Sequence, residues 1–369
     1  MSTKVDQILN TVPEGSAPFP ESPFVIYGAG NCGRDVCRVL KASGHEVAAF
    51  IDVEAEAIIE VDGVPCFSPE SADALEYAAL PVILAIFNNA ADTGAIEAML
   101  REHGFLRIVS YYTFFERFPE KVLSRFWLAP RSTYPLKRAE LNSAFQMFRD
   151  EKSRSIFLET VKLRTTFDLQ LLRAPDPSHQ YLPEDLPAPK CPMRLVDGGC
   201  YVGDTVEAIR AHGFEIEAAA CFEPDPRNFS RLRDFAERQL GGIRELCLFP
   251  CGLGESTAMH RFFAGQDAAS TITEHGESVI QVVALDDVLP NFAPTLFKLD
   301  VEGAERASLL GASKIIERFR PAIAVCLYHR PEDLWELPLL LRKLAPNYEF
   351  AVRYHGFNGF EIVLYAMPL

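Results

Sequence analysis

Two stretches of the chain read as a strand, a glycine-rich turn, a helix and a second strand that ends in an acid. They are FVIYGAGNCGRDVCRVLKASGHEVAAFID, residues 24–52, and LVDGGCYVGDTVEAIRAHGFEIEAAACFEPDP, residues 195–226. A buried strand that passes through glycines into a helix opens a βαβ unit, and such units build a mostly parallel sheet with helices on its faces. The sequence therefore predicts an α/β protein with two Rossmann-like domains.

Changes in pattern along the chain predict where these domains begin and end. Residues 1–22 are rich in proline, serine and glutamate, which predicts a flexible tail. Alternating apolar runs and helical patterns predict the first domain over 23–132, and helical periodicity followed by prolines predicts a helical linker over 133–190. A second alternating series fills 191–369. Its last two runs flank GFNGF, where Asn358-Gly359 favours a tight turn and hence an antiparallel final hairpin.

Charge and cysteine content narrow the classes of partner. The 369 residues include 51 acids and 36 bases, a formal charge of −15 that would repel nucleic acid. The nine cysteines lack metal-ligand spacing, which predicts free thiols, no metal site and a cytoplasmic location. No apolar run is long enough to insert into a membrane. We expect a small-molecule or saccharide acceptor, and the sequence leaves homo-oligomerisation open.

The second glycine-rich turn carries acids where a dinucleotide site would need a cradle for phosphate. Asp197 precedes the turn, Asp204 opens the helix and Glu223 closes the next strand. S-adenosylmethionine suits these residues, because it has no phosphate, bears positive charge and offers a ribose diol that one carboxylate can bind twice. We expect Glu223 to bind the ribose and Asp197 to lie near the ammonium. The full set of expected cofactor-binding residues is Asp197, Gly198, Gly199, Cys200, Tyr201, Gly203, Asp204, Thr205, Glu223 and Pro224.

Most of residues 137–369 resembles the FkbM-type methyltransferases, a family of S-adenosylmethionine enzymes. The resemblance rests on the stretches VDGGCYVGDT, FEPDPRNFSRL, FKLDVEGAERASLLGA, LYHRPEDLWELP and FEIVLYA. It implies methyl transfer, usually to a hydroxyl oxygen of a sugar or secondary metabolite, and a seven-stranded sheet whose last pair is antiparallel. The chain departs from the family pattern at Ile362, where threonine is expected, and at Tyr201 inside the loop.

The first glycine-rich turn has dinucleotide spacing, with Gly28, Gly30 and Gly33 followed by Asp52 at the end of the next strand. It resembles the nucleotide-binding-like domain at the front of some sugar acyltransferases. Three interpretations stay open: a scaffold or oligomerisation domain, a site for a nucleotide or nucleotide sugar, and an oxidoreductase. We expect no hydride chemistry, because no oxidoreductase acid or base is recognisable after Asp52. The alternative function for the whole chain is a non-catalytic nucleotide-sugar or dinucleotide binding protein.

Three side chains are candidate catalytic residues because they follow neighbouring strands of the second domain. Asp300 and Glu302 follow TLFKLD, and His329 follows AIAVCLY. The carboxyl ends of parallel strands face the ligand crevice. With a reference pKa of about 6.5, His329 is the expected general base, whereas Asp300 would orient the acceptor. Glu302 is a further candidate, and a purely structural role for His329 is the alternative.

Overall fold

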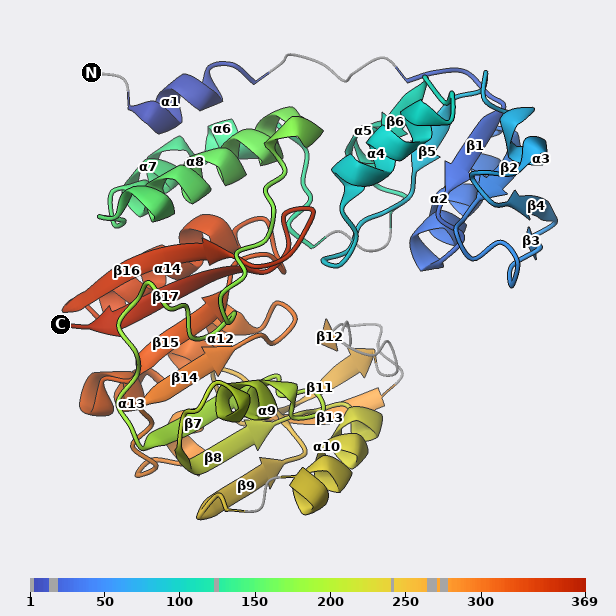
Figure 1. Cartoon of the computed structure of the whole chain (residues 1–369). Coiled ribbons are helices and arrows are strands. Elements are labelled where there is room, and N and C mark those ends of the chain that lie inside the picture. The colour runs from blue at the N-terminus through green and yellow to red at the C-terminus, as the bar shows by residue number, and fades with distance from the viewer. Residues whose placement is uncertain (1–2, 13–18, 123–125, 240–241, 264–270, 273–277) are drawn as a thin grey trace. The chain divides into compact units, whose positions relative to one another are not determined.

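The computed structural model describes residues 3–12, 19–122, 126–239, 242–263, 271–272 and 278–369 (Figure 1). The chain divides into two compact units. Unit 1 comprises Met1–Arg138, Leu158–Pro175 and Gly356–Phe360, and unit 2 comprises Ala139–Phe157, Asp176–His355 and Glu361–Leu369. Within the described ranges, no helix has both the length and the apolar composition needed to cross a membrane.

Unit 1 is built on a six-stranded sheet with the order β3-β4-β2-β1-β5-β6. All its pairings are parallel except that of β3 with β4, which confirms the expected parallel sheet. The first strand is buried along its whole length, as the continuous apolar run FVIY requires. The strands are β1 Phe24–Tyr27, β2 Val47–Ile51, β3 Glu60–Val61, β4 Val64–Phe67, β5 Val82–Leu84 and β6 Ile108–Ser110.

Helices connect these strands and follow them in the chain. They are α2 Asn31–Ala42, α3 Ala72–Leu75, α4 Thr93–Glu102, α5 Tyr111–Arg117 and α6 Thr133–Leu136. The helices α7 Arg138–Phe145 and α8 Glu151–Thr166 and the 3-10 turn Leu169–Leu171 follow, within the segment expected to be helical.

Part of the segment 1–22, which we expected to be a flexible tail, is helical. Lys4–Leu9 forms helix α1, which begins at a reciprocal capping box between Thr3 and Asp6. Val5 and Leu9 of this helix are buried. The proline-rich composition of the segment masked these two apolar positions, which lie four residues apart on one helix face. Residues 1–2 and 13–18 of the expected tail lie outside the described residues.

The loop between the last two strands of the chain contributes Asn358 to the interior of unit 1. The backbone there has φ +56° at Asn358 and +79° at Gly359, the left-handed conformation that the Asn-Gly step favours. The Asn358 amide is completely buried and donates to the carbonyl oxygens of Asn88 and Ala91 at 2.9 and 2.8 Å. The backbone carbonyl oxygen of Asn358 accepts from Trp127 Nε1 at 3.2 Å.

Unit 2 contains the expected seven-stranded sheet, with the order β16-β17-β15-β14-β7-β8-β9 (Figure 1). The five strands other than β16 and β17 pair in parallel, and β17 runs antiparallel to both its neighbours. This confirms the predicted final hairpin. The strands are β7 Met193–Gly198, β8 Ile216–Phe222, β9 Glu245–Phe249, β14 Leu296–Leu299, β15 Ala322–Cys326, β16 Tyr348–Tyr354 and β17 Ile362–Pro368.

A second, four-stranded sheet in unit 2 was not expected from the sequence. Its order is β10-β13-β11-β12, and two of its strands contain only two residues each, too short for periodicity to reveal. The strands are β10 Gly252–Leu253, β11 Ala258–Phe263, β12 Thr271–Ile272 and β13 Ser278–Val283. The remaining helices of unit 2 are α9 Asp204–Ala211, α10 Pro226–Gln239, α11 Leu285–Val288, α12 Glu305–Leu310, α13 Ser313–Phe319 and α14 Asp333–Leu344.

The strand order of unit 2 determines where a ligand can bind. From β7 the chain first builds outward through β8 to β9, and later continues on the other side of β7 with β14. Ligands of open α/β sheets bind outside the carboxyl ends of the strands where the order reverses. That point lies between β7 and β14, whose carboxyl ends carry the glycine-rich turn and Asp300.

Candidate functional site

The turn after β7 is held against the backbone after β14. Gly199 has φ +74°, and a Cβ there would lie 1.8 Å from the carbonyl oxygen of Asp300. The amides of Gly199 and Cys200 both donate to the carbonyl of Phe222 at 3.1 Å. Only glycine allows this approach, so the turn brings the ends of β7, β8 and β14 together.

The other expected cofactor residues surround this turn. Cys200 is buried, Gly203 precedes α9 with φ +95°, and Asp204 and Thr205 form the first turn of that helix. Tyr201 lies inside the loop with φ +48°, and its hydroxyl accepts from Arg231 at 3.1 Å. Tyr201, where the sequence departs from the family pattern, is thus held in the structure by its hydrogen bond from Arg231.

Glu223, directly after β8, points its carboxylate at the same turn. One oxygen accepts from the amide of Tyr201 at 3.1 Å, and the other accepts from the amide of Asp225 at 2.8 Å. Burial raises the pKa of Glu223 to about 7, the charge of Asp225 adds to the rise, and the two amides oppose it. Each oxygen keeps a second lone pair for a ligand hydroxyl.

Asp197 has a different partner from the one the sequence suggested. It is completely buried at the end of β7, and its Oδ1 lies 3.0 Å from Nζ of Lys298 on β14. Burial raises the pKa of Asp197, and the Lys298 charge opposes that rise. Lys298 also donates to the carbonyl oxygens of Gly198 and Gly199. In the structure Asp197 therefore belongs to an internal ion pair that supports the turn, and its position near a ligand ammonium stays a prediction.

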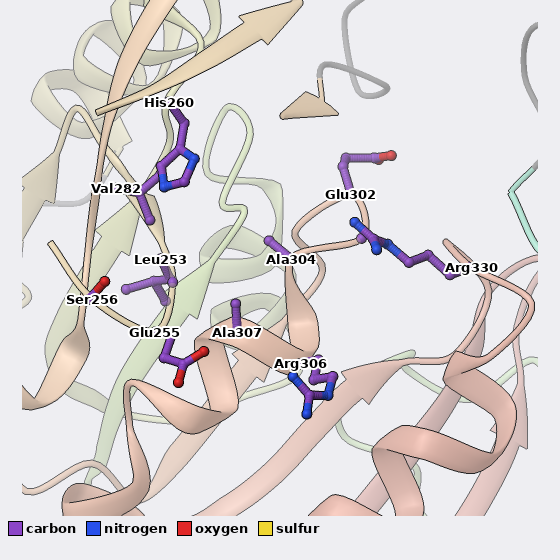
Figure 2. A pocket seen from close by; sticks show the side chains of 12 residues that line it. Leu253, Glu255, Ser256, His260, Val282, Glu302, Ala304, Arg306, Ala307 and Arg330 are labelled. Carbon is purple, nitrogen blue, oxygen red and sulfur yellow. The ribbon is translucent and has the colours of Figure 1, made fainter. Parts of the chain in front are cut away.

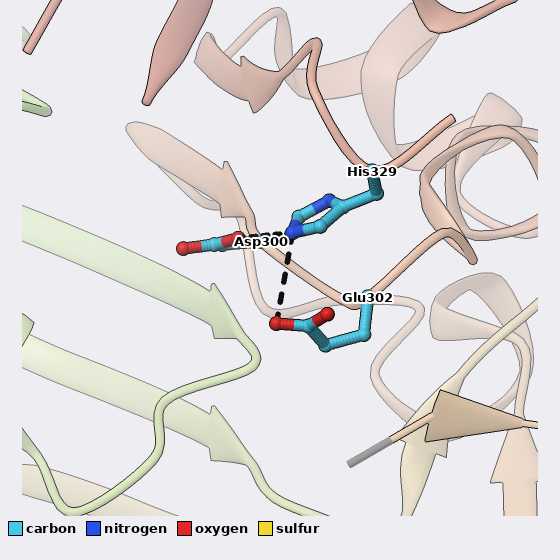
Figure 3. A group of neighbouring side chains, drawn as sticks. All are labelled: Asp300, Glu302 and His329. Atoms are coloured by element: carbon cyan, nitrogen blue, oxygen red, sulfur yellow. Dashed lines mark ion pairs between the residues drawn. The ribbon is translucent and has the colours of Figure 1, made fainter. Parts of the chain in front are cut away.

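The three candidate catalytic side chains lie together at the ends of β14 and β15 (Figure 3). His329 Nε2 is 3.2 Å from Asp300 Oδ1 and 3.7 Å from Glu302 Oε1. On its other side, His329 Nδ1 is 2.8 Å from Glu305 Oε1. The imidazole is 1% exposed, and Asp300 and Glu302 are 21% and 22% exposed. The buried ring thus turns one nitrogen to a buried acid and the other to two acids that reach solvent.

These contacts change the expected protonation of the histidine. Burial favours the neutral ring, but Glu305, Glu302 and Asp300 together raise the pKa of His329 well above its usual value. The three acids therefore favour the protonated ring over the neutral one, and the assignment of His329 as the general base stays a prediction. Sequence reasoning placed the histidine correctly at the strand end but did not include Glu305.

Asp300 is held as a carboxylate by its neighbours. Its Oδ2 accepts from the Tyr181 hydroxyl at 3.0 Å, and its Oδ1 accepts from the Tyr328 hydroxyl at 3.2 Å. Although burial opposes ionisation, His329 and Lys298 hold the pKa of Asp300 well below its usual range. Glu302 behaves differently, because burial raises its pKa to about 8 and the charge of Asp300 adds to the rise.

A pocket of about 410 Å³ opens beside this cluster (Figure 2). Glu302 is the candidate catalytic residue that lines it, and Arg330 and Gly303 form the wall next to Glu302. The opposite wall comes from the second sheet, with Leu253, His260 and Val282. The pocket is large enough for a sugar-sized ligand, and a ligand there would contact Glu302.

In unit 1, the structure brings all four expected nucleotide-site residues together. Gly28 has φ +101°, Gly30 precedes α2, and a Cβ on Gly33 would lie 1.8 Å from the carbonyl oxygen of Gly28. One carboxylate oxygen of Asp52 accepts from the amide of Ala29 at 2.6 Å, and the other accepts from the amide of Glu54. In these contacts Asp52 organises the loop itself.

The two glycines of this turn differ in what they tolerate. We expect Gly33→Ala to destabilise unit 1 by about 3 kcal/mol, because the new methyl group would overlap the backbone of Gly28. Gly30→Ala is the matched control and should cost less than about 1 kcal/mol, since a Cβ there meets no atom within 4 Å. Thermal unfolding of both variants measures the difference, and equal melting temperatures would contradict it.

Lys298, Glu305 and Tyr181 are the site residues that sequence reasoning missed. A lysine inside the apolar run TLFKLD is itself a signal, because a buried cation needs a partner. Glu305 and Tyr181 carried no such local signal. Both reach the cluster only through the fold.

Known proteins resemble this chain in sequence and in fold. Residues 197–357 match the family model of the methyltransferase FkbM domain. The crystal structure of methyltransferase FkbM from Methylobacillus flagellatus KT is similar in fold, with a TM-score of 0.75 at 21% identity. The similarity covers 98% of this chain and 93% of that one. No curated protein matches the chain significantly.

Proposed function

We propose, on the premise that residues 197–357 belong to the methyltransferase FkbM family, that the chain transfers a methyl group from S-adenosylmethionine to a hydroxyl oxygen of a sugar or secondary metabolite. The observation that carries the proposal is the Glu223 carboxylate, directed at a glycine turn where the strand order reverses. The nine free thiols support a cytoplasmic location.

The residues around the turn fit the proposed cofactor. S-adenosylmethionine supplies a methyl group on a positively charged sulfur. Glu223 is placed to accept from both ribose hydroxyls, and acids rather than cations flank the turn, which suits a ligand without phosphate. Asp197 and Lys298 act as positioning residues, because Lys298 pairs with Asp197 and also donates a hydrogen bond to the backbone carbonyl of Gly199 in the turn.

The acceptor is proposed to occupy the pocket beside Glu302. As the new carbon–oxygen bond forms, the hydroxyl must lose its proton, so a group within hydrogen-bond reach must accept it. Glu302 lines the pocket. Asp300 lies close to Glu302, because both carboxylates face the same nitrogen of His329. We assign proton acceptance to the Glu302 carboxylate and the orientation of the acceptor to Asp300.

Glu223→Ala should weaken S-adenosylmethionine binding on the order of a hundredfold or more. Two charge-assisted hydrogen bonds of about 1.5 to 3 kcal/mol each would be lost. Calorimetric titration of the full chain measures the loss, with exposed Glu237→Gln as the matched control. Unchanged affinity in Glu223→Ala would show that the ribose is held elsewhere, and absence of binding to the wild-type chain would overturn the proposed cofactor.

The same titration has an expected pH dependence. The carboxylate form of Glu223 accepts the ribose hydroxyls, and its pKa of about 7 means that this form is lost as the pH falls through neutrality. From pH 8 to pH 6 the affinity should fall by up to about tenfold. Glu223→Gln should remove this dependence, and a flat profile in the wild-type chain would argue against Glu223 as the ribose ligand.

We propose that unit 1 serves as a scaffold. Asp52, the expected ribose ligand of a nucleotide site, links the glycine turn after β1 to the loop after β2 through the backbone amides of Ala29 and Glu54, a structural role that needs no ligand. Titration of the full chain with NAD and with a nucleotide sugar tests this assignment. Binding of either ligand that Gly30→Val abolishes would restore the alternative of a nucleotide-binding unit.

A further inference from the structure

We propose that Asp300, Glu302 and His329 form a binding site for one divalent cation of the Mg²⁺ or Mn²⁺ class. The sequence predicted no metal site, because no cysteine or histidine pair has the usual spacing. The three ligands instead come from the ends of two neighbouring strands. Binding of the ion stands independently of the proposed function, and only its role toward the acceptor rests on that function.

The spacing of the ligand atoms fits such an ion. One nitrogen or oxygen from each of the three residues lies within 4.8 Å of the others. Adjacent ligands of an octahedral ion with bonds of about 2.1 Å are about 3 Å apart. His329 Nε2 lies 3.2 Å from Asp300 Oδ1 and 3.7 Å from Glu302 Oε1, so small side-chain movements complete the geometry.

A buried acid orients the imidazole as metal-binding histidines require. Glu305 is completely buried, and its Oε1 lies 2.8 Å from His329 Nδ1. Its hydrogen bond from the amide of Val301 fixes the same carboxylate oxygen in place at 2.9 Å. A carboxylate on the far ring nitrogen sets the tautomer and increases the basicity of the ligating nitrogen. His329 Nε2 is the nitrogen left to face Asp300 and Glu302 (Figure 3).

The charge around the ring also favours a cation. Four acids influence the single imidazole: Asp300, Glu302, Glu305 and Asp333. The nearby cation Lys298 forms its ion pair with Asp197 at 3.0 Å. A divalent ion bound there would bring positive charge directly to Asp300 and Glu302, the two acids that face His329 Nε2.

The position of the site gives the ion a role in the proposed reaction. Glu302 belongs both to the cluster and to the wall of the pocket (Figure 2). Three protein ligands leave octahedral positions open on the pocket side. An acceptor hydroxyl bound there would be held beside the expected methyl group, and the ion would favour transfer of the hydroxyl proton to the Glu302 oxygen that does not bind the ion.

Electron paramagnetic resonance of the full chain titrated with Mn²⁺ tests the site. We expect one bound ion per chain, and binding weaker by at least about a hundredfold in His329→Ala. Glu302→Gln, which changes a partly exposed side chain, should weaken binding too and guards against a folding defect in the first variant. His103→Ala in unit 1 is the matched control and should bind as the wild-type chain does.

Two results would overturn the inference: no stoichiometric Mn²⁺ binding to the wild-type chain, or unchanged binding in both cluster variants. Calorimetry with S-adenosylmethionine in the presence of a chelator separates this failure from failure of the proposed function. Cofactor binding without Mn²⁺ binding would reject the metal site alone. Mn²⁺ binding without cofactor binding would reject the proposed cofactor and leave the metal site standing.

Discussion

His329→Ala is expected to lower turnover by roughly 10²- to 10⁴-fold while leaving S-adenosylmethionine affinity nearly unchanged. The imidazole contacts Asp300 and Glu302, the two acids on the rim where the acceptor oxygen is proposed to bind. Removal of the imidazole takes away the group that both acids contact, so the proposed proton acceptor Glu302 and the acceptor-orienting Asp300 would no longer be held in position. Glu223 and the glycine turn contact other residues, so the cofactor site should be retained.

The split between turnover and affinity distinguishes this role from a purely structural one. Steady-state kinetics on an identified acceptor gives turnover, calorimetry gives cofactor affinity, and the melting temperature verifies folding. His103→Ala is the matched control and should leave all three values unchanged. A folded His329→Ala protein with normal turnover would remove the histidine from the mechanism and leave Asp300 and Glu302 as the candidates.

Lys298→Met should destabilise the protein by about 3 to 5 kcal/mol, because it leaves the Asp197 carboxylate buried without its cation. The two side chains are 2% and 0% exposed, so water cannot replace the lost partner. The variant also removes the hydrogen bonds from Lys298 to the carbonyls of Gly198 and Gly199. Urea unfolding measures the effect.

Two further variants make the stability prediction specific. The double variant Asp197→Leu/Lys298→Met should recover most of the lost stability, because apolar pairs often replace buried ion pairs without cost. Lys314→Met on the exposed face of α13 should change stability by less than about 0.5 kcal/mol. If the single Lys298→Met variant were as stable as the control, the buried Asp197 carboxylate would not depend on Lys298 for stability, and the prediction would be wrong.

Local sequence patterns were sufficient to predict the framework of both sheets. The alternation of apolar runs with helical periodicity predicted the parallel strands, and two aromatic-rich runs separated by an Asn-Gly step predicted the antiparallel end of the second sheet. The four strands of the second sheet of unit 2 were not predicted, and β10 and β12 contain only two residues each, too few to carry a measurable period. Helix α1 escaped because only Val5 and Leu9 of a proline-rich segment are apolar and buried.

The site was predictable only where its residues lie next to a strand end. Glu223, Asp300 and His329 each follow an apolar run directly, so their common edge could be inferred from the sequence. The ion pair of Asp197 with Lys298 could not, because it depends on the register of β7 against β14, which places these two residues opposite each other. Glu305 reaches His329 from the start of α12, a position that no local pattern specifies.

The sequence by itself determined most strands of the parallel sheets, the final hairpin, which turns need glycine and which acids stand at the strand ends, because these depend on neighbours along the chain. The tertiary structure alone decided which acids surround His329 and raise its pKa, and which cation is the partner of Asp197. The physical reason is that a pKa and a buried charge depend on every group within a few ångströms. Here those groups come from strands and helices that are far apart in the chain.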